Sequence, residues 1–142
     1  MSIAPYKHKI QFYETDQMGI VHHSNYIRWF EEARVDFMEQ LGLSYHKVVS
    51  MGVDIAVVGV SCEYKSMTKF SETVQINVHI SKMTPVRMTV EYKVLGSENG
   101  ELCATGETRH CFIRRIDQRP VSLAKELPEL FELLKGKFQN DV

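Results

Sequence analysis

The sequence predicts an α+β domain in which a five-stranded antiparallel β-sheet wraps around one long α-helix. One long segment has helical periodicity and is too apolar to lie on a surface. Several later segments alternate between apolar and polar residues, as strands with one buried face do. Short connections between those segments favour antiparallel neighbours. Because the helix and the sheet each have an apolar face to bury, the two pack as layers of one domain.

The long helix is predicted over Ser24–Leu41, after a first strand over Lys7–Tyr13 that places Ile10 and Phe12 on one face. Trp29 widens the apolar sector of the helix, which favours an embedded helix. Ser24 is the predicted N-terminal cap, and Gly42 is the predicted stop. The apolar positions recur at spacings of three and four residues, at Tyr26, Phe30, Ala33, Phe37 and Leu41.

The remaining elements are four strands and two short helical segments. Asn99-Gly100 is a strong tight-turn signal before the last strand. A short helix or turn is predicted over Ser44–Ser50, and a closing amphipathic helix, interrupted or started by Pro128, over Ser122–Lys135. The predicted strands are Ile55–Tyr64, Thr73–Ser81, Arg87–Leu95 and Leu102–Arg115.

Composition limits the classes of protein to which the chain can belong. Its 142 residues are enough for one domain, which we expect to cover residues 1–142. Hydrophobic residues are 44% and charged residues 25%, an ordinary globular mixture. A net charge of −1 argues against a nucleic-acid-binding protein that acts through bulk charge.

Cysteine usage and hydropathy predict the compartment. Cys62, Cys103 and Cys111 are odd in number and form no CxxC pair, so we expect reduced thiols. The first twelve residues lack the pattern of a signal peptide, and no apolar run of about 18 residues suits a membrane span. These features predict a cytoplasmic protein without a transmembrane segment.

An acid near the start of the long helix is the strongest functional signal. Asp16 lies in a polar loop, Gly19 allows that loop to turn sharply, and the helix begins within about eight residues of the acid. A carboxylate that faces unpaired helix N–H groups forms a site in which the carboxylate can attack one carbonyl group and the N–H groups can polarise it. The alternative is that Asp16 is a turn residue that only accepts hydrogen bonds from local N–H groups.

The motif around Asp16 resembles the signature of the hotdog-fold 4-hydroxybenzoyl-CoA thioesterase family, running Thr15-Asp16-x-x-Gly19-Ile20-Val21-His22-His23-x-Asn25-Tyr26. The resemblance implies a hotdog fold, a dimer in which two sheets join, and active sites shared between protomers. It implies that Asp16 is the catalytic carboxylate and that a backbone N–H near His23 binds the thioester oxygen. Some family members carry aromatic residues in place of the two histidines, so no side-chain role for His22 or His23 follows.

Hydrolysis of an acyl-CoA thioester suits this set of groups. A free thiol has a pKa of about 8.5, so the leaving thiolate needs no strong general acid. Asp16 can attack directly or activate a water molecule, and the sequence leaves both routes open. No metal site is expected, because His22 and His23 have no third ligand or HExxH motif beside them. No organic cofactor is expected either.

Further residues are assigned to the predicted site. Asn25 either hydrogen-bonds the helix end or contacts substrate or water. Tyr26 lines the pocket or belongs to the core. Ser66 and Thr68 follow a strand and are expected to reach a partner's site. Coenzyme A phosphates need cations, and we assign Lys82 and Arg87 from the candidates Lys65, Lys69, Lys82, Arg87, Arg114 and Arg115.

Alternative functions remain open at this stage. A hydratase or dehydratase on the same fold is one, although the proline-containing loops typical of such enzymes are missing between Pro5 and Pro85. A non-catalytic acyl-CoA-binding module is another. Acyl-carrier protein could replace coenzyme A, and the acyl group is undetermined. We expect a homodimer or homotetramer, because an isolated sheet has two exposed edges.

Overall fold

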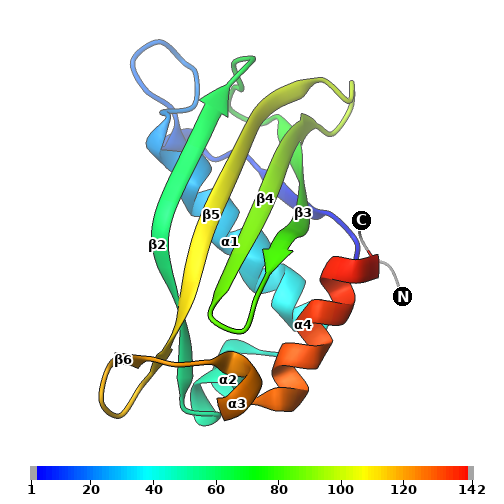
Figure 1. Cartoon of the computed structure of the whole chain (residues 1–142). Coiled ribbons are helices and arrows are strands. Elements are labelled where there is room, and N and C mark those ends of the chain that lie inside the picture. The colour runs from blue at the N-terminus through cyan, green and yellow to red at the C-terminus, as the bar shows by residue number, and fades with distance from the viewer. Residues whose placement is uncertain (1–2, 141–142) are drawn as a thin grey trace.

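The computed structural model describes residues 3–140 of the chain. The long helix α1 (Ser24–Gln40) lies in the curl of one antiparallel sheet (Figure 1). The other helices are α2 (Tyr45–Ser50), α3 (Leu123–Glu126), α4 (Pro128–Asn140) and the single 3₁₀ turn η1 (Phe12–Glu14). The strands are β1 (Tyr6–Lys9), β2 (Val53–Tyr64), β3 (Thr73–Met83), β4 (Arg87–Gly96), β5 (Leu102–Arg114) and β6 (Arg119–Pro120).

The sheet has the strand order β1-β3-β4-β5-β2, so β1 and β2 form its edges. The core lies between this sheet and α1, where Trp29, Phe30 and Ala33 are fully buried. Phe30 stacks on Tyr92 with ring centroids 4.5 Å apart. It also lies directly over Gly106, where an added Cβ atom would stand 2.2 Å from the ring. The predicted sheet wrapped around a central helix is therefore confirmed, with the two-residue β6 as an unpredicted sixth strand.

The first strand is shorter than predicted. It ends at Lys9, and the chain then turns through η1 instead of continuing to Tyr13. Ile10 is fully buried whereas Phe12 is 73% exposed, so the two do not share a face of the sheet. The cause is local: the Glu14 carboxylate accepts the Gln11 N–H over 2.8 Å and draws the backbone into a turn.

The helix boundaries agree with the predicted periodicity but not with the predicted cap. His23 precedes the first helical residue and has helical dihedral angles, without a side-chain cap. Ser24 is inside the helix, with its Oγ 2.9 Å from the His22 Nδ1 atom. The end at Gly42, with φ of +81°, and the break before Pro128 are as predicted. Among residues 3–140, no helix is long and apolar enough to cross a membrane. All three cysteines are free.

Candidate active site

Asp16 lies at the base of a tight loop between η1 and α1. Its backbone N–H donates to the Ile20 carbonyl over 2.9 Å, and the Gly19 N–H donates back to the Asp16 carbonyl over 3.0 Å. Gly19 has φ of +78°, a conformation that side chains disfavour. Thr15 and Val21 form a β-bridge across the base of the loop. The loop therefore holds Asp16 by main-chain bonds on both sides.

The Asp16 carboxylate is only half used by its own loop. Its Oδ1 atom accepts the Met18 N–H over 2.8 Å, which is the bond that the turn-residue interpretation expects. The Oδ2 atom has no hydrogen-bond partner among the described residues. The side chain is partly exposed. One carboxylate oxygen is thus fixed while the other is open to solvent or substrate.

The backbone N–H groups at the start of α1 differ in their hydrogen-bond partners. The Asn25 N–H donates to the His22 carbonyl over 3.0 Å, and the Tyr26 N–H donates to the His23 carbonyl over 3.3 Å. The Ser24 N–H lies 3.2 Å from the His22 Nδ1 atom. Within the described part of the chain, the His23 N–H has no partner. This free N–H stands at the positive end of the helix dipole, where developing negative charge is stabilised.

A cavity of about 340 Å³ brings Asp16 and His23 together. Of the other predicted residues, Tyr26 and Ser66 also line it. Tyr64 and Lys65, which the sequence analysis did not assign to the site, complete its wall with Ile20, Val21 and Met67. Tyr64 ends β2 and Lys65 follows it, and the end of β2 reaches the start of α1 (Figure 1), a relation that depends on the folded topology.

Two tyrosines shape this wall. The Tyr64 hydroxyl donates to the His23 carbonyl over 3.1 Å, and burial together with a hydrogen bond to Cys62 raises the pKa of Tyr64 to about 12. The Tyr26 hydroxyl lies 2.7 Å from the Thr68 Oγ1 atom, and burial raises the pKa of Tyr26. Both phenols therefore stay neutral and act as hydrogen-bonding groups near the helix start.

Thr68 and Asn25 have supporting positions. Thr68 is buried behind Tyr26 and does not line the cavity, although its carbonyl accepts the Val21 N–H over 2.9 Å. The buried Asn25 amide donates to the Glu14 carbonyl over 2.9 Å and to the His22 carbonyl over 3.3 Å. Of the two interpretations of Asn25, this geometry fits hydrogen bonding at the helix end. Asn25 and Asp16 also border a second hollow of about 620 Å³.

The predicted cations Lys82 and Arg87 do not lie at this cavity. They flank the β3–β4 turn, at the opposite end of the sheet from the Asp16 loop (Figure 1). Arg87 is aligned across the sheet with Ala56 of β2, eight residues before Tyr64. That separation is about 25 Å along a strand. Within one chain, Lys65 is the cation that the cavity includes.

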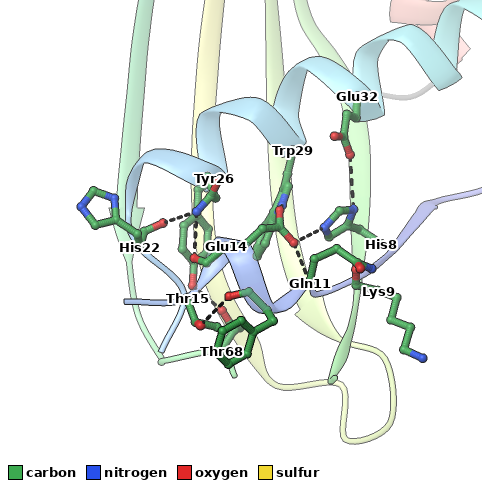
Figure 2. A network of polar contacts seen from close by, with 12 residues as sticks. His8, Lys9, Gln11, Glu14, Thr15, His22, Tyr26, Trp29, Glu32 and Thr68 are labelled. Carbon is green, nitrogen blue, oxygen red and sulfur yellow. Dashed lines mark hydrogen bonds and ion pairs between the residues drawn. The ribbon is translucent and has the colours of Figure 1, made fainter. Parts of the chain in front are cut away.

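A buried carboxylate, Glu14, was missed by the sequence analysis. It is 4% exposed, and Figure 2 shows it between His8, Gln11 and Trp29. Burial alone would raise the pKa of Glu14, but hydrogen bonds from these three residues outweigh burial and lower it. Glu14 directly follows the predicted first strand, which ends at Tyr13, and no role was assigned to it from the sequence.

The two histidines form no metal site with their neighbours. Their rings stack with centroids 4.1 Å apart. Among residues 3–140, no group of three or more His, Cys, Asp or Glu side chains is placed to hold a metal ion.

Comparison with known proteins identifies the family. Residues 10–131 match the thioesterase-like superfamily. A protein of Aquifex aeolicus, provisionally named an esterase, is 34% identical over 127 residues, which are 89% of this chain and 96% of that protein. A protein of Bacillus subtilis, provisionally named acyl-CoA thioesterase YneP, is 27% identical over 91% of this chain and 93% of its own length.

A solved structure agrees with the sequence matches. The DHNA-CoA thioesterase from Staphylococcus aureus superimposes with a TM-score of 0.88 at 29% identity, covering 94% of this chain and 89% of that one. The chain therefore belongs to the thioesterase-like superfamily and is a hotdog-fold thioester hydrolase.

Proposed function

We propose that this protein hydrolyses acyl-CoA thioesters, with Asp16 as nucleophile or general base and the start of α1 polarising the thioester carbonyl. One observation carries the proposal. Among the residues that the structure describes, one Asp16 carboxylate oxygen and the His23 backbone N–H have no hydrogen-bond partner, and both residues line the same cavity of about 340 Å³. Hydrolysis of a thioester uses both groups, because one attacks the acyl carbon or activates the attacking water and the other stabilises the thioester oxygen.

Both routes use the same geometry. In the direct route an Asp16 oxygen bonds to the acyl carbon, the carbon–sulfur bond breaks, and coenzyme A leaves as a thiolate; water then hydrolyses the mixed anhydride. In the other route Asp16 accepts a proton from a water molecule whose oxygen bonds to the acyl carbon, the carbon–sulfur bond breaks, and coenzyme A leaves as a thiolate. In each, the oxyanion lies at the positive end of the α1 dipole.

Coenzyme A is the proposed carrier of the acyl group. The relative in Staphylococcus aureus is named a DHNA-CoA thioesterase and the relative in Bacillus subtilis an acyl-CoA thioesterase, so coenzyme A is common to both names. Lys65 stands at the cavity, with its Nζ 3.0 Å from a Glu63 carboxylate oxygen, and is available to a phosphate-bearing substrate. Acyl-carrier protein, which bears the same phosphopantetheine chemistry, is the alternative carrier.

The test is a thiol-release assay with Asp16→Asn on a panel of short aliphatic, long aliphatic and aromatic acyl-CoAs. The substitution keeps the side-chain shape, so the fold is retained. We expect kcat/KM for the best substrate to fall by at least about a hundredfold. The matched control is Asp117→Asn, in the exposed turn after β5, which should keep the parent rate. Near-parent activity of Asp16→Asn would contradict the assignment.

A further inference from the structure

Glu14 is attached to the rest of the molecule at both its side chain and its main chain. Its carboxylate accepts the Gln11 N–H over 2.8 Å at Oε1 and the Trp29 indole N–H over 2.7 Å at Oε2. The His8 Nε2 atom lies 2.8 Å from Oε1 (Figure 2). The side chain therefore joins β1, η1 and the middle of α1 at one buried point.

The main chain of Glu14 closes the loop that carries Asp16. Its carbonyl accepts the His22 N–H over 2.8 Å and the Asn25 side-chain amide over 2.9 Å. His22 and Asn25 flank His23, whose N–H is the unpaired donor at the cavity. Glu14 is thus bonded to the helix start, and Asp16 follows Glu14 by two residues in the chain.

Glu14 does not contact the site directly. It is 4% exposed and lines neither hollow that borders Asp16. A role as the nucleophile or as the base is therefore excluded by access, and any effect on catalysis must act through the loop.

We propose that Glu14 is a positioning residue that fixes Asp16 relative to the His23 N–H, an inference that rests on the proposed thioesterase function. The carboxylate is ionised and receives three hydrogen bonds, which makes it a stiff anchor. Misplacement of a reacting group by about 1 Å can cost about a hundredfold in rate. Loosening this anchor should therefore slow the chemical step more than it weakens substrate binding.

Glu14→Gln tests the proposal, because glutamine keeps the shape but replaces one acceptor oxygen with a donor NH₂ group. That group must face either the Trp29 indole N–H or the donors at Oε1. We expect kcat to fall at least about tenfold while KM changes by less than about threefold.

The matched control is Glu32→Gln, in the same network. The Glu32 carboxylate contacts His8 and the Tyr6 hydroxyl but makes no bond to the loop. We expect Glu32→Gln to keep kcat within about twofold of the parent. A second control, Leu134→Ala in the α4 core, should lower the urea midpoint of unfolding and leave kcat of the folded enzyme unchanged.

Hydrogen exchange supplies a readout independent of turnover. The His22 amide, bonded to the Glu14 carbonyl, should exchange faster in Glu14→Gln than in the parent or in Glu32→Gln. If Glu14→Gln does not fold, Trp29→Phe removes one donor while keeping an aromatic ring, and it should show the same changes to a smaller extent.

The proposal would be overturned if kcat and His22 exchange were both unchanged in the folded Glu14→Gln variant. If only Trp29→Phe folds, the same result in that variant would overturn it. An equal fall of kcat in Glu32→Gln or Leu134→Ala would also overturn it, because general destabilisation would then be the cause. A parent protein that hydrolyses none of the acyl-CoAs would refute the proposed function instead, while His22 exchange would still test the anchor.

Discussion

Glu14 and Asp16 are acids two positions apart with opposite environments. Asp16 keeps one oxygen free at a cavity, whereas Glu14 is buried and has donors on both oxygens. The motif and the nearby helix start made Asp16 predictable from the sequence. Glu14 could not be predicted in the same way, because its donors come from His8, Gln11 and Trp29, which only the fold brings together.

A buried histidine makes stability depend on pH. His110 is 1% exposed, its Nε2 atom lies 2.7 Å from Thr108 Oγ1, and its Nδ1 atom has no partner among the described residues. Burial, together with the charge of Arg34, lowers the pKa of His110 to about 4. Below the unfolded value of about 6.5, the unfolded chain therefore binds a proton that the folded chain does not.

We accordingly expect the free energy of unfolding to fall as pH decreases from about 6.5 to about 4, by roughly 3 kcal/mol from this group. His110→Phe removes the titrating group and should flatten the curve in that window. Urea unfolding of both proteins at several pH values measures the difference. Equal losses in the two proteins would assign the pH dependence to other groups. Glu14 contributes a separate loss. Because its pKa is lowered in the folded protein, the stability that it contributes is lost only as pH falls below the ordinary pKa range of a carboxyl group.

At the scale of elements, periodicity predicted the helix and the sheet strands well because each buries one face against the other. The exceptions are local. β1 ends early because the Glu14 side chain bonds the Gln11 backbone, and β6 has only two residues and no periodicity to detect. The position of Tyr64 and Lys65 at the cavity was also beyond the sequence, since it depends on which strand end meets the start of α1.

The contact between α1 and the sheet includes a close approach at one glycine. Gly106 lies under the Phe30 ring, where an added Cβ would stand 2.2 Å away. Gly106→Ala should destabilise the protein by about 1–3 kcal/mol, because a packed core resists an inserted methyl group. The control is Gly136→Ala in α4, where an added Cβ meets nothing within 4 Å. That change should be stabilising by up to about 1 kcal/mol, because alanine favours helix.

Urea unfolding of the two alanine variants measures this difference. A Gly106→Ala variant as stable as the parent would show that α1 moves away from the sheet without cost. Adding Phe30→Leu to Gly106→Ala should recover part of the loss, since the smaller side chain leaves room for the methyl group, and a double-mutant cycle measures that coupling.

The whole molecule presents an apolar sheet edge. β2 is twelve residues long and lies at the edge of the sheet, with Val57, Val58 and Val60 between 37% and 53% exposed. An edge of this length and character is a template for pairing with another strand. We propose that two copies pair through β2 in an antiparallel manner, forming a homodimer or the unit of a homotetramer.

Such pairing would place the predicted cations near an active site after all. Tyr64 ends β2 beside the Asp16 cavity, and Ala56, at the other end of β2, is aligned with Arg87 across the sheet. Antiparallel pairing of two β2 strands brings opposite ends together. The β3–β4 turn of one copy, with Lys82 and Arg87, would then approach the Asp16 end of the other. A site shared in this way cannot be located from the sequence of one chain.

The double substitution Val57→Lys and Val60→Lys tests the edge. Two lysines on an edge strand oppose pairing, because their charges would have to be buried between copies. We expect the parent to be a dimer or tetramer in sedimentation equilibrium at micromolar concentration and the variant to be a folded monomer with reduced thioesterase activity. Ile116→Lys is the matched control, since Ile116 is 90% exposed in the turn between β5 and β6 and is not part of β2. It should keep the parent's mass. A monomeric parent would contradict the β2 interface, and an oligomeric double variant would move the interface to another surface.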